Sequence, residues 1–307
     1  MPHSHGDDHG RIGDRDALRG ALALVALFAV VEVVAGYAAH SLALLADAGH
    51  MLGDAGSLGL ALFAAWLGSR PASPGRSFGY RRAEILAALA NGVALVAIAI
   101  WIVVEALQRL RDPVEPSGGW VLLVGAVGLA LNLAAASLLH RRGSVSLNMQ
   151  GALRHVLADA LGSLGVIAAG AIVFLTGWSY ADPLVALVIA VLVLGSSWTL
   201  LRDSVAILLE ATPRGLDAEE IGRAMIEVND VREVHDLHVW TITSGFPSLS
   251  AHVLVAQDAD CHAKRRELEL VLAERFGLSH TTLQVDHAGA GSGRVELGTA
   301  EARRTPL

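Results

Sequence analysis

HMLGDA at residues 50–55 recurs as HVLADA at residues 155–160. Each copy lies in a long apolar run, and Gly-Ser-Leu-Gly follows each copy within one or two residues. The second copy lies three apolar runs further along the chain, so its helix would cross a membrane in the opposite direction. The sequence therefore contains an inverted repeat, which some membrane proteins place around a central site.

Apolar runs of membrane-spanning length dominate the chain. A spanning helix needs about 20 mostly apolar residues. The 307 residues are 53% hydrophobic and 17% charged, with a mean hydropathy of +0.50, whereas soluble domains are about 25% charged. We expect an all-α bundle of six transmembrane helices, at Leu18–Ala39, Leu42–Leu67, Ala83–Leu107, Trp120–Leu139, Val156–Trp178 and Pro183–Leu201.

Composition also excludes several classes of protein. The single cysteine, Cys261, rules out a disulfide framework and a cysteine-rich metal site. The net charge of −7 leaves no basic surface for nucleic acid, so no nucleic-acid partner is expected. Lys264 is the only lysine among 23 basic residues, a bias typical of GC-rich bacterial genomes.

The distribution of arginine predicts the orientation in the membrane. Arginines occur before the first run and in the loops after the second and fourth runs, whereas the loops after the first and fifth runs contain no Lys or Arg. The loop after the third run has Arg109 and Arg111, which are offset in part by Asp112 and Glu115. Loops rich in Lys and Arg face the cytoplasm. We therefore expect an integral protein of the bacterial inner membrane with both termini in the cytoplasm.

The composition changes after Ala211. The following residues alternate between helical and strand patterns in the order α-β-β-α-β, which favours a small α+β ferredoxin-like sheet covered by helices. We expect a flexible His-containing segment at 1–16, the transmembrane domain at 17–210, the ferredoxin-like domain at 211–288 and a disordered tail at 289–307.

The repeat has the chemistry of a metal site. His50 and Asp54 lie one helical turn apart, as do His155 and Asp159, so each pair shares a helix face. Two imidazoles and two carboxylates can hold a divalent ion tetrahedrally, and nitrogen and oxygen ligands suit Zn²⁺. Because metal binding expels protons from such ligands, exchange of protons for metal follows from the ligand set.

Two other functions remain open at this point. A membrane-bound sensor or scaffold would bind zinc without transporting it. A membrane metalloenzyme is disfavoured, because four protein ligands fill a zinc site and a catalytic zinc keeps one position open. The chain is therefore not expected to be an enzyme.

Four segments resemble the cation diffusion facilitators. They are SLALLADAGHMLGD at 41–54, FGYRRAE at 78–84, LNMQGALRHVLADALGS at 147–163 and YADPL at 180–184. The resemblance runs from about residue 16 to residue 287. It implies a homodimeric divalent-metal/proton antiporter with six transmembrane helices and a cytoplasmic ferredoxin-like domain. His50, Asp54, His155 and Asp159 match the zinc-exporting branch, which also moves Cd²⁺.

The resemblance also implies a second zinc site in the cytoplasmic domain, where bound zinc would act as a regulatory ligand. The matching positions are His235, His252 and Asp286, and Gln284 stands where some members have a further histidine. Several other polar residues fall within the membrane runs, and we expect packing hydrogen bonds or proton transfer from them: Glu32, Asn91, Glu105 and Asn132.

Overall fold

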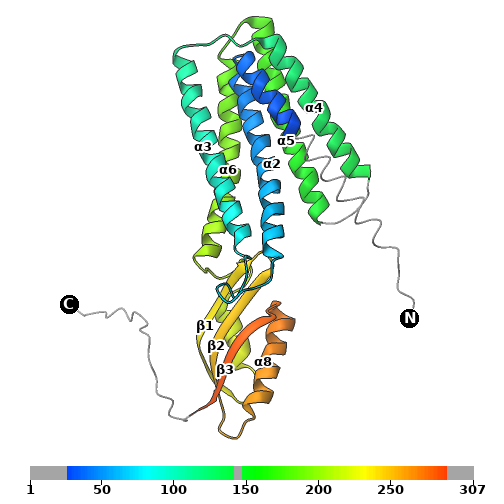
Figure 1. Ribbon diagram of the computed structural model, residues 1–307. Coiled ribbons are helices and arrows are strands. Elements are labelled where there is room, and N and C mark those ends of the chain that lie inside the picture. Colours follow the sequence, from blue (N-terminus) through cyan, green and yellow to red (C-terminus); the bar gives the residue numbers. More distant parts are fainter. Residues whose placement is uncertain (1–25, 142–146, 289–307) are drawn as a thin grey trace, which may run out of the picture. The chain divides into compact units, whose positions relative to one another are not determined.

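The structure is a computed structural model that describes residues 26–141 and 147–288 (Figure 1). The segments predicted to be flexible at 1–16 and disordered at 289–307 lie outside these residues. The chain divides into two compact units, Met1–Ala206 and Ile207–Leu307, which are described separately.

The N-terminal unit is helical. A helix at Ala26–Ala38 precedes α2 (Leu42–Gly68), α3 (Ala83–Arg111), α4 (Gly118–Arg141), α5 (Leu147–Thr176) and α6 (Ala181–Leu208). Within the described residues, α2, α3, α6 and the Asp159–Thr176 part of α5 are long and apolar enough to cross a membrane. The helix at Ala26–Ala38 and the Gly118–Ala134 part of α4 are apolar but shorter. The first predicted span begins at Leu18, so its start lies outside the described residues.

Glycines allow α4 and α5 to pack closely as an antiparallel pair, to the right of α2 in Figure 1. A Cβ atom on Gly118 would lie 2.6 Å from the backbone nitrogen of Phe174. A Cβ atom on Gly170 would lie 2.8 Å from the backbone nitrogen of Leu122. Small residues at such contacts let helix backbones approach, which is how membrane helices gain van der Waals contact.

The start of α2 is held by Asp182 at the start of α6. The buried carboxylate of Asp182 accepts hydrogen bonds from the Ser41 hydroxyl at 2.5 Å and from the backbone N–H groups of Leu42 at 2.6 Å and Ala43 at 3.3 Å. These N–H groups have no partner within their own helix. Arg109 of α3 donates to the His40 carbonyl at 2.6 Å, so α2, α3 and α6 meet at this end.

The C-terminal unit has the predicted order of elements. It contains α7 (Ala218–Ile226), β1 (Val231–Thr243), β2 (Phe246–Val255), α8 (Cys261–Phe276) and β3 (His280–His287). The central strand of the sheet is β2, which runs antiparallel to β1 and parallel to β3. The two helices begin at Asp217 and Asp260, whose carboxylates accept hydrogen bonds from backbone N–H groups of the first turn.

The core of this unit lies on one face of the sheet. Alternate residues of β2, from Leu249 to Val255, are buried against the apolar sides of α7 and α8. The intervening residues of β2 point to the opposite face, as the period of two in a strand requires. His252 is one of them, and it is paired across the sheet with His235 of β1.

Replacement of Asp182 by alanine should destabilise the protein. The change leaves the first N–H groups of α2 without their acceptor in an apolar environment, at a cost of about 1–3 kcal/mol. Thermal unfolding of the purified protein in detergent measures the effect. Asp112→Ala, at an exposed position at the end of α3, is the matched control. Equal melting temperatures for the two variants would contradict this account of the α2 start.

Candidate metal centre

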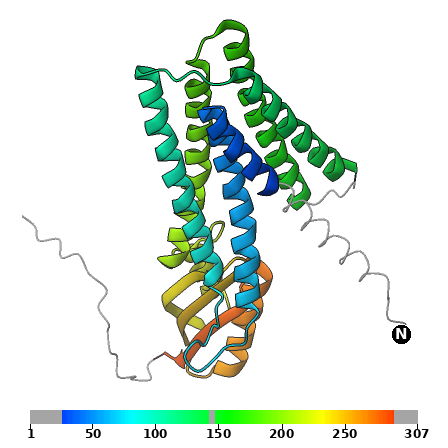
Figure 2. The same cartoon turned by 45° about the horizontal axis from the view of Figure 1, so that its top comes forward.

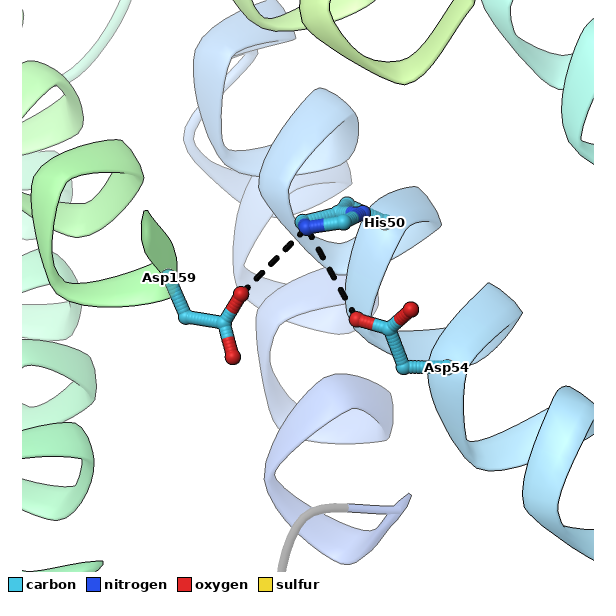
Figure 3. Close-up of side chains that lie close together, drawn as sticks. All are labelled: His50, Asp54 and Asp159. Atoms are coloured by element: carbon cyan, nitrogen blue, oxygen red, sulfur yellow. Dashed lines mark ion pairs between the residues drawn. The ribbon is translucent and has the colours of Figure 1, made fainter. Parts of the chain in front are cut away.

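Three side chains of the predicted site meet between α2 and α5. His50 and Asp54 come from successive turns of α2, and Asp159 comes from α5 (Figure 3). The Nε2 atom of His50 lies 3.3 Å from Asp159 Oδ1 and 3.7 Å from Asp54 Oδ2. Both carboxylates point toward the imidazole ring, so two helices distant in sequence supply one cluster.

This cluster has the donor set of a divalent-cation site. One ligand atom from each residue lies within 4.8 Å of the others, and among the described residues no other group of three His, Cys, Asp or Glu side chains meets that condition. The side chains of His50, Asp54 and Asp159 are 23%, 28% and 15% exposed. Each side chain is therefore mostly buried, and the exposed part leaves access for an ion.

His155, the fourth predicted ligand, lies on α5 one turn before Asp159. Its side chain lies outside those that the structure describes, so its part in the cluster stays a prediction. The same holds for the tetrahedral geometry, which needs all four ligands.

A further carboxylate, that of Asp47, lies one turn before His50 on α2 and is absent from the predicted ligand set. Asp47 is 2% exposed, and its Oδ2 accepts a hydrogen bond from Ser163 of α5 at 3.3 Å. Asn132 of α4 donates to the same Ser163 hydroxyl at 3.3 Å. The sequence contained a signal for Asp47, because residues three apart are neighbours on a helix and Asp47 therefore shares a face of α2 with His50.

The other polar membrane residues have different environments. Asn91 donates to Ser57 at 2.6 Å, which joins α3 to α2 as a packing hydrogen bond. Glu105 accepts from Arg109 at 2.9 Å within α3. Glu32 is 0% exposed, and neither of its carboxylate oxygens has a hydrogen-bond partner among the described residues.

The polar face of the C-terminal sheet brings two of its three predicted ligands together. His235 of β1 is paired with His252 of β2, and the centroids of their rings are 5.4 Å apart. Asp286 of β3 instead accepts a hydrogen bond from Gln284 at 2.8 Å. The described residues of this domain contain no group of three ligand atoms as close as those at His50.

An aspartate outside the predicted set lies beside these histidines. Asp236 has a φ of 53°, and the pairing of β1 with β2 shifts between His235 and His238. Asp236 lies 2.9 Å from the Nε2 atom of His238 and 3.8 Å from that of His252. The hydrogen bond with His238 lowers the pKa of the Asp236 carboxyl below its usual value. The carboxylate is therefore ionised at neutral pH and available to a cation.

Family models match both units of the chain. Residues 18–209 match the cation efflux transmembrane domain, and residues 213–288 match the cytoplasmic domain of cation efflux proteins. The two matched regions together take in nearly all of the described residues.

Relatives of similar length cover most of the chain. The metal cation efflux system protein CzcD of Cupriavidus metallidurans is 40% identical, with 94% of this chain and 91% of that protein covered. The zinc transporter ZitB of Escherichia coli is 40% identical, with 94% and 93% covered. The cadmium, cobalt and zinc/H⁺-K⁺ antiporter of Bacillus subtilis is 37% identical, with 92% of each chain covered. The chain therefore belongs to the cation efflux family of membrane transporters, the cation diffusion facilitators.

Proposed function

We propose that this protein is a divalent-metal/proton antiporter that exports Zn²⁺, and also Cd²⁺, from the cytoplasm. The ion binds His50, Asp54, His155 and Asp159 between α2 and α5. The observation that carries the proposal is the 3.3 Å approach of Asp159 to His50, because it joins the two copies of the repeat at one point. The names of the relatives support the metals and the exchange for protons.

The charge of this ligand set accounts for the exchange. Two aspartates and two neutral histidines offset the charge of Zn²⁺, so the occupied site is neutral in an apolar surrounding. Without the metal, unpaired carboxylates there are costly, and protons replace the ion. Protons arriving from outside therefore compete for the ligands and release zinc on that side.

The antiporter has six transmembrane helices in residues 17–210 and a ferredoxin-like cytoplasmic domain in residues 211–288. It works as a homodimer in the bacterial inner membrane, with both termini in the cytoplasm. The proposal of a dimer is supported by the match to the cytoplasmic-domain model, and the orientation is supported by the arginine-rich loops. The segments at 1–16 and 289–307 lie outside the described residues.

Transport by proteoliposomes tests the proposed function. With Zn²⁺ added under an imposed pH gradient, the wild type should take up zinc while protons move in the opposite direction. Asp54→Ala removes a ligand and should reduce zinc flux about 100-fold or more, because loss of a residue that only supports a ligand already costs about 10–100-fold. Asp112→Ala should transport like the wild type. Zinc binding without flux in the wild type would contradict transport and favour the sensor.

Competition between protons and zinc predicts a pH dependence of affinity. Free histidine titrates near pH 6.5, so lowering the pH from about 7.5 to about 5.5 protonates imidazoles that must be neutral to bind metal. The half-saturating zinc concentration should therefore rise as the pH falls. Flux measured over a range of zinc concentrations at each pH provides the test, and a constant half-saturating concentration would contradict a histidine-containing site.

His235, His252 and Asp286 form a regulatory zinc site in the cytoplasmic domain under this proposal. The proximity of the His235 and His252 rings supports it. His252→Ala should lower the number of zinc ions bound per chain by one, measured by metal analysis after dialysis of the purified full chain. His262→Ala, at the exposed start of α8, should bind as many ions as the wild type. An unchanged stoichiometry in His252→Ala would contradict this site.

A further inference from the structure

Glu32 occupies an unusual position for an ionisable residue. It lies on the helix of Ala26–Ala38, drawn in dark blue between α2 and the α4–α5 pair in Figures 1 and 2. A Cβ atom on Gly128 of α4 would lie 3.2 Å from Glu32 Oε1, so this glycine leaves room for the carboxyl group. One turn further along the same helix, Gly36 packs against Leu45 of α2.

A packing role does not account for this side chain. The residue is 0% exposed, and neither carboxylate oxygen has a hydrogen-bond partner among the described residues. Burial of a polar group without a partner is unfavourable, and burial of an unpaired charge is more so. In such a place the neutral, protonated form of a carboxyl group costs less free energy than the charged form. Ionisable residues inside a membrane often mark the pathways of ions and protons.

Glu32 is electrostatically connected to the metal site. Among the described residues, the Asp47 carboxylate of α2 is near enough for its charge to act on Glu32, and the charges of His50 and Asp159 act in turn on Asp47. The apolar part of α4 from Gly118 to Ala134, which includes Gly128 beside Glu32, contains no ionisable residue. The charge at Glu32 therefore responds to the charge held between α2 and α5, with little else to screen it.

We propose that Glu32 binds a proton that is exchanged for the metal, at a position separate from the metal ligands. This inference rests on the proposed antiport. When Zn²⁺ from the cytoplasm binds between α2 and α5, its positive charge favours the carboxylate. The O–H bond of Glu32 breaks, the electron pair stays on the carboxylate oxygen, and the proton passes to water on the cytoplasmic side. When Zn²⁺ departs, the remaining negative charge favours uptake of a proton by the same oxygen. By linkage, a proton on Glu32 lowers the affinity for zinc by the same factor by which bound zinc lowers the affinity of Glu32 for the proton.

Glu32→Gln tests the proposal, because glutamine has the shape of the protonated acid and cannot release a proton. The wild type and the variant are reconstituted in proteoliposomes containing a pH-sensitive dye. We expect the variant to carry zinc down a zinc gradient at a rate within about threefold of the wild type, with fewer protons moved per zinc ion. Its half-saturating zinc concentration at about pH 7.5 should be about tenfold higher, and should depend less on pH.

Two further variants separate proton exchange from a structural role. Glu32→Asp keeps a carboxyl group and should restore part of the proton movement. Glu105→Gln makes the same chemical change in another membrane helix and should keep the proton-to-zinc ratio of the wild type. The proposal would be overturned if Glu32→Gln kept the proton-to-zinc ratio of the wild type and the same pH dependence of the half-saturating zinc concentration. It would also be overturned if Glu32→Gln and Glu32→Asp lost downhill zinc flux equally. If the wild type itself moves zinc without protons, the antiport proposal fails instead.

Discussion

The proposed metal site depends on one approach between helices, that of Asp159 on α5 to His50 on α2 at 3.3 Å. Ionisable side chains in an apolar bundle usually pair with one another or face a cavity, because isolated charges there are costly. Both helices are held in place by contacts away from this point. Asp182 fixes the start of α2, and glycines set the distance between α4 and α5. The cluster is therefore built on helices positioned by other parts of the unit.

The carboxylates around this point form two groups with different surroundings. Asp54 and Asp159 face a histidine and are partly exposed, as ligands that must gain and lose an ion should be. Asp47 and Glu32 are buried, and only Asp47 has a hydrogen-bond donor among the described residues. Under the proposed antiport, this difference would separate direct coordination of the metal from storage of a proton nearby. A change in charge at one group then affects the others, because the apolar surroundings screen charges weakly.

Much of the architecture could be predicted from local pattern. Apolar runs gave the helices of the first unit, and period-two alternation with turn residues gave the α-β-β-α-β order of the second. The spacing of His50 and Asp54 placed both on one face of α2, because i and i+4 residues are neighbours on a helix. The count of six spanning helices stays a prediction, because the start of the first run lies outside the described residues.

Contacts between distant segments could not be predicted in this way. Ser41 and Asp182 are separated by 141 positions, and no local pattern pairs them. Asp236 should face the core if strand alternation continued from His235. Its left-handed backbone shifts the register and turns it toward His238 and His252 instead. Aspartate adopts this conformation more readily than most residues, yet its place in a strand gave no signal for the shift.

A double-mutant cycle on zinc affinity tests most directly whether α2 and α5 hold one ion. Zinc dissociation constants are measured for the full chain and for Asp54→Ala, Asp159→Ala and the double variant, all in a His252→Ala background that removes the proposed cytoplasmic site. Ligands of one ion act together, so the double variant should bind little more weakly than either single variant. Losses that add would mean that the two carboxylates act independently, and an unchanged dissociation constant in either single variant would mean that its carboxylate binds no ion. Either result would contradict one ion held by α2 and α5.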